Sequence, residues 1–187
     1  MPQHALILGG QRSGKSRCAE ARAADWLAQP GHSAVLLATA TAGDDEMRTR
    51  IARHQADRVL RVPAIRTFEV PIALPQALRA QAAPQCLVVV DCLTLWLTNL
   101  LMPMQGDALS DAALAEVRDA LCDALAAASG PVLLVSNEIG LGISPMTREV
   151  RRFVDELGRL HQMVAARCDA VTLMVAGIEV PVKRGDA

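Results

Sequence analysis

The feature that most constrains this chain is a glycine-rich segment near its start. Residues 9–16 read Gly-Gly-Gln-Arg-Ser-Gly-Lys-Ser and fit the pattern G-x-x-x-x-G-K-[ST]. The preceding residues 5–8 are apolar and of strand length, and the residues that follow favour a helix. A strand, a glycine-rich turn and a helix in this order aim backbone N–H groups and a helix N-terminus at one anion. The segment therefore predicts a phosphate-binding loop, or P-loop.

Every residue of this loop is a candidate nucleotide ligand. In such loops the lysine reaches the β and γ phosphates and the following hydroxyl ligates Mg²⁺, so Lys15 is a catalytic candidate and Ser16 a metal ligand. The alternative, a glycine-rich turn with a surface lysine, does not explain the strand before and the helix after. The nucleotide-binding candidates here are Gly9, Gly10, Gln11, Arg12, Ser13, Gly14, Lys15 and Ser16.

A second metal ligand is expected where another buried strand ends. Four apolar residues, 87–90, run directly into Asp91. A carboxylate in this place holds Mg²⁺ in P-loop proteins, directly or through water. Asp91 also fits a second, compatible interpretation, in which it caps the helix that begins near Leu93.

Apolar runs and helical patterns alternate along the chain. The expected strands lie at residues 5–8, 34–38, 86–90, 132–135 and 170–175, and the helices at 15–28, 46–55, 74–81, 93–101, 111–128 and 145–166. The strands are apolar at both odd and even positions, which is typical of a parallel sheet covered by helices on both faces. Ser110 is an expected cap for the fifth helix, and Ser144 followed by Pro145 for the sixth.

The composition indicates one folded domain over residues 1–187. Hydrophobic residues make up 51% and charged residues 21%, with a net charge of −1, unlike a disordered chain. Aromatic residues are only 2%, without Tyr, so stacking platforms for bases are scarce and we expect no nucleic-acid partner. The apolar stretch 86–106 carries Asp91 and Pro103, so we expect a strand and a helix there and no membrane span.

The five cysteines are scattered without a C-x-x-C pair, and residues 1–16 lack the pattern of a signal peptide. We therefore expect reduced thiols and a cytoplasmic protein. Three histidines, at positions 4, 32 and 161, have no carboxylate or cysteine at metal-ligand spacing. We expect them to be structural or surface residues, without a zinc site.

A fourth histidine lies in a charged helical segment. Helical spacing aligns Glu46, Arg50 and His54 on one face. This face fits a solvated helix with ion pairs, but an imidazole among arginines is also a competent nucleophile toward phosphorus. The residues of this segment do not decide between the two.

Guanine recognition of the switch GTPase kind is not expected. Those proteins read guanine through an N-K-x-D segment after a strand. Here the strand at 132–135 is followed by Ser-Asn-Glu-Ile-Gly, without the lysine and aspartate. Asn137 and Glu138 nevertheless stand where open α/β sheets bind ligands.

Several blocks in the same order resemble one known family. They are residues 9–16; 38–40 with 45–47; 50–51 with His54; 91–94 with 98–101; 137–142; and 176–178. Together they resemble the bifunctional adenosylcobinamide kinase / adenosylcobinamide-phosphate guanylyltransferase of cobalamin biosynthesis. The resemblance runs from residue 6 to residue 178. The segment after His54, residues 58–67, is longer than the family's usual form and lacks its tryptophan.

The resemblance implies a fold, a pair of reactions and a set of site residues. The fold is a RecA-like P-loop sheet with helices on both faces and an antiparallel edge, in a homotrimer. The enzyme phosphorylates adenosylcobinamide with GTP or ATP and Mg²⁺, then transfers GMP from GTP to adenosylcobinamide phosphate. His54 stands where the family carries its guanylylated histidine. Beyond the P-loop, the residues at the family's GTP contacts are Thr39, Ala40, Thr41, Gln55, Ala56, Asp57, Arg58, Glu69 and Asp91.

Two other functions use the same loop. A small-metabolite kinase would need the P-loop and Asp91 but no covalent histidine, and a RecA-like ATPase would be an assembly motor. The blocks outside the P-loop weigh against the kinase. The short chain and the lack of a basic, aromatic-bearing surface for nucleic acid weigh against the motor.

Overall fold

The computed structural model describes residues 3–143 and 145–184. Its strands are β1 (His4–Gly9), β2 (Ser33–Ala38), β3 (Arg66–Glu69), β4 (Cys86–Asp91), β5 (Val132–Val135), β6 (Ala170–Val175) and β7 (Ile178–Lys183). Its helices are α1 (Lys15–Leu27), α2 (Asp45–Arg61), α3 (Leu74–Gln81), α4 (Leu93–Leu101), α5 (Asp111–Ala126) and α6 (Arg148–Arg167).

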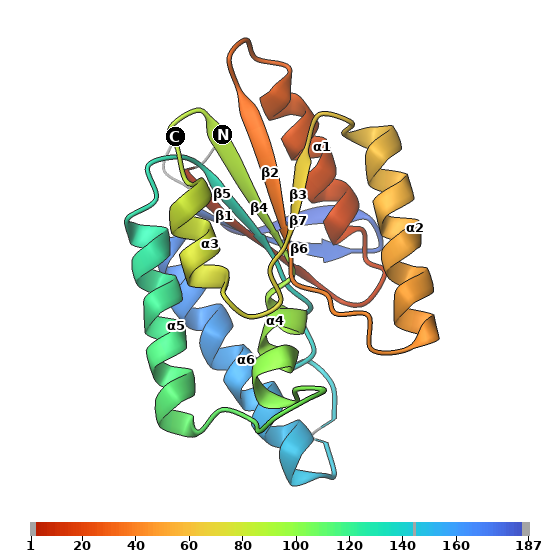
Figure 1. Cartoon of the computed structure of the whole chain (residues 1–187), viewed down its shortest axis with the longest axis vertical. Helices are drawn as coiled ribbons and strands as arrows, with labels where there is room; N and C mark the ends of the chain where they lie inside the picture. Colours follow the sequence, from red (N-terminus) through yellow and green to blue (C-terminus); the bar gives the residue numbers. More distant parts are fainter. Residues whose placement is uncertain (1–2, 144, 185–187) are drawn as a thin grey trace.

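All the strands form one sheet in the order β3-β2-β4-β5-β1-β6-β7. Every neighbouring pair is parallel except β6 and β7, so β7 is the expected antiparallel edge. Helix α1, with α2 outside it, covers one face, and α3, α4, α5 and α6 cover the other (Figure 1). This arrangement confirms the predicted doubly covered, mostly parallel P-loop sheet.

Two apolar cores lie on the two faces of the sheet. Alternate residues of one strand belong to different cores: Leu6 belongs to the core shared with α3, α4, α5 and α6, whereas Ile7 belongs to the core shared with α1. Trp96 on α4 is fully buried and donates from Nε1 to the Ile72 carbonyl at 2.8 Å. The apolar character at both parities of each strand therefore reflects burial on both sides.

The structure corrects several predicted bounds. β3 was not predicted, because its four residues are all exposed and it pairs only with β2 at the sheet edge. β7 was not among the predicted strands either, since its residues are exposed too. Helix α2 does not end near residue 55 but continues to Arg61.

Helix capping agrees with the sequence at one helix and differs at another. Ser110 caps α5 as predicted, accepting from the Ala113 N–H at 3.3 Å. Helix α6 begins at Arg148 and not at residue 145, because Thr147 caps it by accepting from the Val150 N–H. Ser144, the predicted cap, lies outside the described residues.

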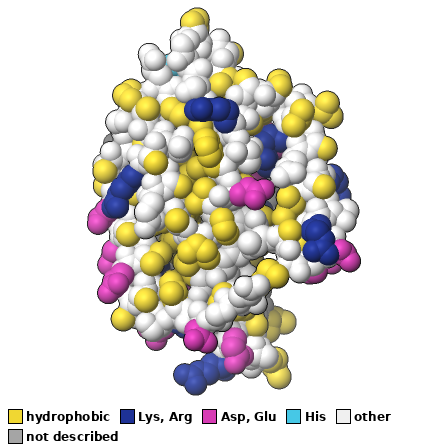
Figure 2. Space-filling view, in the orientation of Figure 1, with side chains coloured by type: hydrophobic (Ala, Val, Ile, Leu, Met, Phe, Trp, Pro, Cys, Tyr) yellow, Lys and Arg dark blue, Asp and Glu magenta, His cyan; other side chains and the backbone are white. Residues whose placement is uncertain are grey.

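The surface mixes residue types. On the face shown in Figure 2, Lys and Arg side chains lie singly among apolar and acidic ones. Within residues 3–143 and 145–184, no helix is long and apolar enough to cross a membrane. The cysteine thiols are free, and all five are buried.

The contrast between a buried and an exposed leucine gives a test of this fold. Leu121 on α5 is 0% exposed, whereas Leu60 on α2 is 84% exposed. We expect Leu121→Ala to lower the free energy of unfolding by about 2–5 kcal/mol, because it leaves a cavity in the core. The matched Leu60→Ala change should stay within about 0.5 kcal/mol. Urea unfolding measures both, and equal losses would contradict the core assignment.

Candidate nucleotide site

The P-loop lies between β1 and α1 and is shaped by backbone conformations that favour glycine. Gly9 and Gly14 have φ angles of 151° and 102°. A Cβ on Gly9 would lie 2.6 Å from both the Met174 carbonyl oxygen and Ser13 Oγ. Among the described residues no side chain caps α1, so its first N–H groups face the loop. The loop is therefore built to receive an anion.

Lys15 is held inside this loop. Its side chain is largely buried, with the residue 8% exposed, and Nζ donates to the Gly10 carbonyl at 2.6 Å. Burial lowers the pKa of Lys15 below its usual value, and the nearby Arg50 guanidinium lowers it further, while Cys92 and Asp91 act in the opposite direction. Arg50 on α2 thus lies close enough to the loop to act on its lysine.

Ser16 and Asp91 meet as the sequence predicts. Ser16 Oγ donates to Asp91 Oδ2 at 3.0 Å, joining the first turn of α1 to the end of β4. Cys92 occupies the N-cap position of α4, so the capping interpretation of Asp91 is wrong. A hydroxyl and a carboxylate beside a phosphate loop supply the oxygen ligands that Mg²⁺ prefers.

Thr39, Ala40 and Thr41 follow β2 at the same edge of the sheet. Thr39 is 0% exposed, and its hydroxyl donates to the Cys92 carbonyl at 2.7 Å and accepts from the Cys92 N–H at 2.8 Å. The Thr41 hydroxyl is exposed and donates to Asn99 Oδ1 at 2.7 Å. Thr39 therefore joins β2 to β4, and Ala40 and Thr41 lie nearer to solvent.

His54 lies half-buried on α2, one helical turn beyond Arg50. Residues i and i+4 share a helix face, so His54 and Arg50 lie on one side of α2. Helix α2 is tied to α1 by Arg61, whose NH1 lies 2.8 Å from Glu20 Oε2. The structure thus places the predicted nucleophile on a neighbouring helix and not in the loop itself.

The predicted contacts after His54 are spread along α2 and β3. Gln55 and Ala56 are exposed. Asp57 pairs with Arg61 at 3.4 Å, and Arg58 NH1 donates to Thr67 Oγ1 at 3.4 Å. Glu69 ends β3, in register with Ala38, and is exposed. Among the described residues no hydrogen bond joins any of the five to the P-loop.

A buried polar network that the sequence did not predict lies beneath the site. His161 Nε2 lies 2.7 Å from Ser136 Oγ, which lies 3.0 Å from Thr94 Oγ1. The other ring nitrogen of His161 lies 3.7 Å from Glu138 Oε2. His161 is structural as expected, but it is buried against the end of β5. The only signal in the sequence was a set of polar residues directly after two apolar strands.

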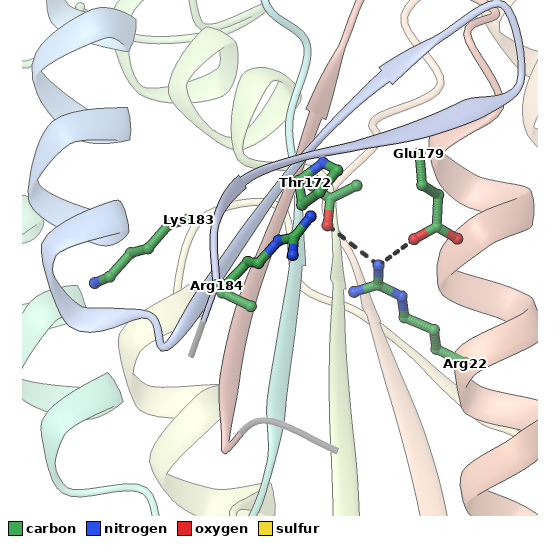
Figure 3. A pocket seen from close by; sticks show the side chains of 7 residues that line it. Arg22, Thr172, Glu179, Lys183 and Arg184 are labelled. Carbon is green, nitrogen blue, oxygen red and sulfur yellow. Dashed lines mark hydrogen bonds and ion pairs between the residues drawn. The ribbon is translucent and has the colours of Figure 1, made fainter. Parts of the chain in front are cut away.

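A cavity of ≈ 490 Å³ lies elsewhere on the protein, between α1 and the β6–β7 hairpin (Figure 3). Arg22 NH2 crosses it to Thr172 Oγ1 at 3.2 Å and Glu179 Oε2 at 2.6 Å. Ala170, which also lines it, pairs with Ala5 at the start of β1, whereas the P-loop follows the other end of that strand. Among the described residues that line the cavity, none belongs to the P-loop.

Comparison with known proteins decides the family. The family model described as "Cobinamide kinase / cobinamide phosphate guanyltransferase" matches residues 5–182. The chain belongs to this family. The match confirms the resemblance seen in the sequence. The matched range of this cobinamide kinase / guanyltransferase family member contains the P-loop, Asp91 and helix α2 with His54.

Relatives support the same assignment over nearly the whole chain. The bifunctional adenosylcobalamin biosynthesis protein CobP of Pseudomonas aeruginosa is 49% identical over 179 residues, covering 95% of this chain and 96% of that protein. The CobU protein of Salmonella typhimurium is 37% identical, covering 95% of this chain and 98% of that protein.

A solved structure shares the fold alone. The crystal structure of flagellar accessory protein FlaH from Methanocaldococcus jannaschii matches with a TM-score of 0.54 and 10% identity, covering 98% of this chain and 79% of that one.

The buried histidine beneath the site makes stability depend on pH. Burial lowers the pKa of His161 below its usual 6.5. As pH falls through about 6.5, an unfolded chain protonates this histidine before the folded chain does. The unfolded state then binds more protons, so the free energy of unfolding decreases toward acid.

We expect His161→Gln to remove this contribution. In urea unfolding between pH 5 and 7, the wild-type protein should lose stability toward acid more steeply than the variant. The difference is at most about 1.4 kcal/mol per pH unit, the limit for one proton. Identical slopes would show that His161 titrates alike in both states.

Proposed function

We propose that this chain performs both reactions named for its family. It phosphorylates adenosylcobinamide with GTP or ATP, and it transfers GMP from GTP to the resulting phosphate, giving adenosylcobinamide-GDP. The observation that carries the proposal is the contact of Ser16 with Asp91 beside a complete P-loop. The family match and the relatives' names supply the two reactions.

In the kinase reaction, the loop binds the triphosphate and Lys15 neutralises charge on the transferred phosphoryl group. The backbone N–H groups of residues 9–16 and the start of α1 hold the phosphate oxygens. Arg12 projects from the same loop, where its backbone adopts a φ of 56°. Lys15 is held by the Gly10 carbonyl before substrate arrives, which is the condition for effective charge stabilisation.

Mg²⁺ is the cofactor that fits this site. Ser16 and Asp91 would hold it, since their oxygens already lie 3.0 Å apart. The ion would neutralise phosphate charge on the bound nucleotide. Ser16 is the residue that hydrogen-bonds to the Asp91 side chain among the described residues, through Oδ2, which leaves Oδ1 to serve a metal.

In the guanylyl transfer, His54 is the nucleophile. A ring nitrogen attacks the α-phosphorus of GTP, the bond to the bridging oxygen breaks, and pyrophosphate leaves while the ring loses its proton. The phosphate of adenosylcobinamide phosphate then takes the GMP and regenerates the histidine. Two displacements replace a single direct one. The position of His54 on the α2 face that bears Arg50 supports this role as the nucleophile.

The remaining GTP contacts belong to the same proposal. The nucleotide is contacted from the ends of β2 and β3 and from α2, by Thr39, Ala40, Thr41, Glu69 and the segment from Gln55 to Arg58. The enzyme works in the cytoplasm as a homotrimer. Support for the location is the set of free, buried thiols, and support for the trimer is the family resemblance. A lone kinase or an ATPase motor would leave His54 without a role.

Loss of the loop lysine should stop both reactions. We expect Lys15→Ala to abolish phosphorylation and guanylyl transfer, because both use a triphosphate anchored by one loop. The assays are product formation from adenosylcobinamide and from its phosphate. Guanylyl transfer at the wild-type rate in this variant would refute a shared site.

Loss of the histidine should separate the two reactions. With GTP labelled at the α-phosphorus, the wild-type protein should retain label after denaturation, and His54→Ala should retain none. Phosphorylation of adenosylcobinamide should fall much less. Retained label in the variant would assign the nucleophile to another residue, and absence of label from the wild-type protein would favour a lone kinase.

The chemistry of the label identifies the atom that carries it. A phosphorus–nitrogen bond to histidine should survive alkali and break in acid, because a protonated ring nitrogen is a good leaving group. Esters of serine or threonine are stable in acid. Incubation of the labelled, denatured protein at low and high pH measures the difference, and an acid-stable label would exclude histidine.

A further inference from the structure

The strand β5 lies between the strand that carries the P-loop and the strand that carries Asp91. Its last residue, Val135, is in register with Ile7 on β1 and with Asp91 on β4. The chain beyond β5 continues along β1: the Ser136 N–H donates to the Ile7 carbonyl at 2.9 Å, and the Glu138 N–H to the Gly9 carbonyl at 3.0 Å. Glu138 is therefore fixed against the first residue of the P-loop.

The Glu138 carboxylate is oriented by two groups. Its Oε1 accepts from the Gly140 N–H at 2.6 Å, and its Oε2 lies 3.7 Å from His161 Nδ1. Thr94 anchors the same segment from below, accepting from the Asn137 N–H at 2.7 Å. The Glu138 side chain remains 22% exposed. Its position is fixed, yet solvent and a substrate can reach it.

The other candidate groups at this edge already have different tasks. Asp91 accepts from Ser16, and Lys15 is a cation without a free lone pair. His54 is the nucleophile of the other reaction. The acceptor in the kinase reaction is a neutral hydroxyl, which gives up its proton when it bonds to phosphorus. A carboxylate next to the P-loop is a suitable group to receive it.

We propose that Glu138 is the general base of the kinase reaction, an inference that rests on the proposed function. The hydroxyl oxygen of adenosylcobinamide attacks the γ-phosphorus, and its proton passes to the Glu138 carboxylate. The bond between the γ-phosphorus and the bridging oxygen breaks, and the nucleoside diphosphate leaves. Glu138 later gives the proton to water.

The guanylyl half-reaction gives the experiment an internal control, because formation of His54-GMP involves no acceptor hydroxyl. The test variant is Glu138→Gln, which keeps the size of the side chain and an oxygen for the Gly140 N–H. Glu116→Gln, on the exposed side of α5, is the matched control. Phosphorylation of adenosylcobinamide is followed in a single turnover with enzyme in excess, so that product release does not mask chemistry.

We expect Glu138→Gln to slow phosphorylation by about 10²–10⁴-fold, the range for loss of a general base. Label from α-labelled GTP should be captured on the protein at the wild-type rate. The Glu138→Asp variant, which keeps a base but shortens its reach, should fall between Glu138→Gln and wild type. Glu116→Gln should be unchanged in both assays.

Three results would overturn the proposal. Equal losses in phosphorylation and in GMP capture would show that Glu138 only supports the loop. A loss of less than about tenfold in phosphorylation would assign the proton to another acceptor. Glu138→Asp as slow as Glu138→Gln would point to a shape requirement. Failure of the proposed function is distinguishable, because then the wild-type protein itself would neither phosphorylate adenosylcobinamide nor capture label.

Discussion

Parallel pairing across the sheet is the constraint on which the site depends. Because β2, β4, β5 and β1 run in one direction, all of them end at one edge. The residues that follow these strands are Thr39, Cys92, Ser136 and the P-loop. The Thr39 hydroxyl bonds to the Cys92 backbone, and the Glu138 N–H, two residues beyond Ser136, donates to the Gly9 carbonyl. A shift of one pair by a single residue would move Asp91 away from Ser16 and exchange the two apolar faces.

The sequence predicted the parts of the fold that both faces of the sheet bury. The five apolar strands could be recognised because each contributes alternately to two cores. The edge strand β3 could not, since Arg66, Thr67 and Glu69 are polar and only pairing with β2 makes them a strand. The length of α2 was also hidden, because its charged surface gives no apolar stripe and it buries no residue.

Prediction of the site followed the same division between local and distant information. The P-loop and the carboxylate of Asp91 each follow a strand directly, so local patterns sufficed. The Ser136–His161 contact joins residues 25 positions apart, and Thr94 joins them from 42 positions away. Only packing of α6 against the end of β5 brings these groups together. The same packing makes Glu138 a fixed carboxylate, whereas the sequence predicted only its place at the ligand-binding end of a strand.

The loose attachment of α2 has a consequence for the proposed role of His54. A helix without buried residues, held to α1 by the Arg61–Glu20 ion pair, loses little apolar contact when it moves. Segments with few buried contacts open at low free energy, while the sheet stays intact. His54 therefore lies on a loosely held helix, whereas the P-loop lies on the well-packed sheet. In the proposed guanylyl transfer, a histidine on such a helix would carry GMP from the loop to a bulky acceptor without the sheet having to deform.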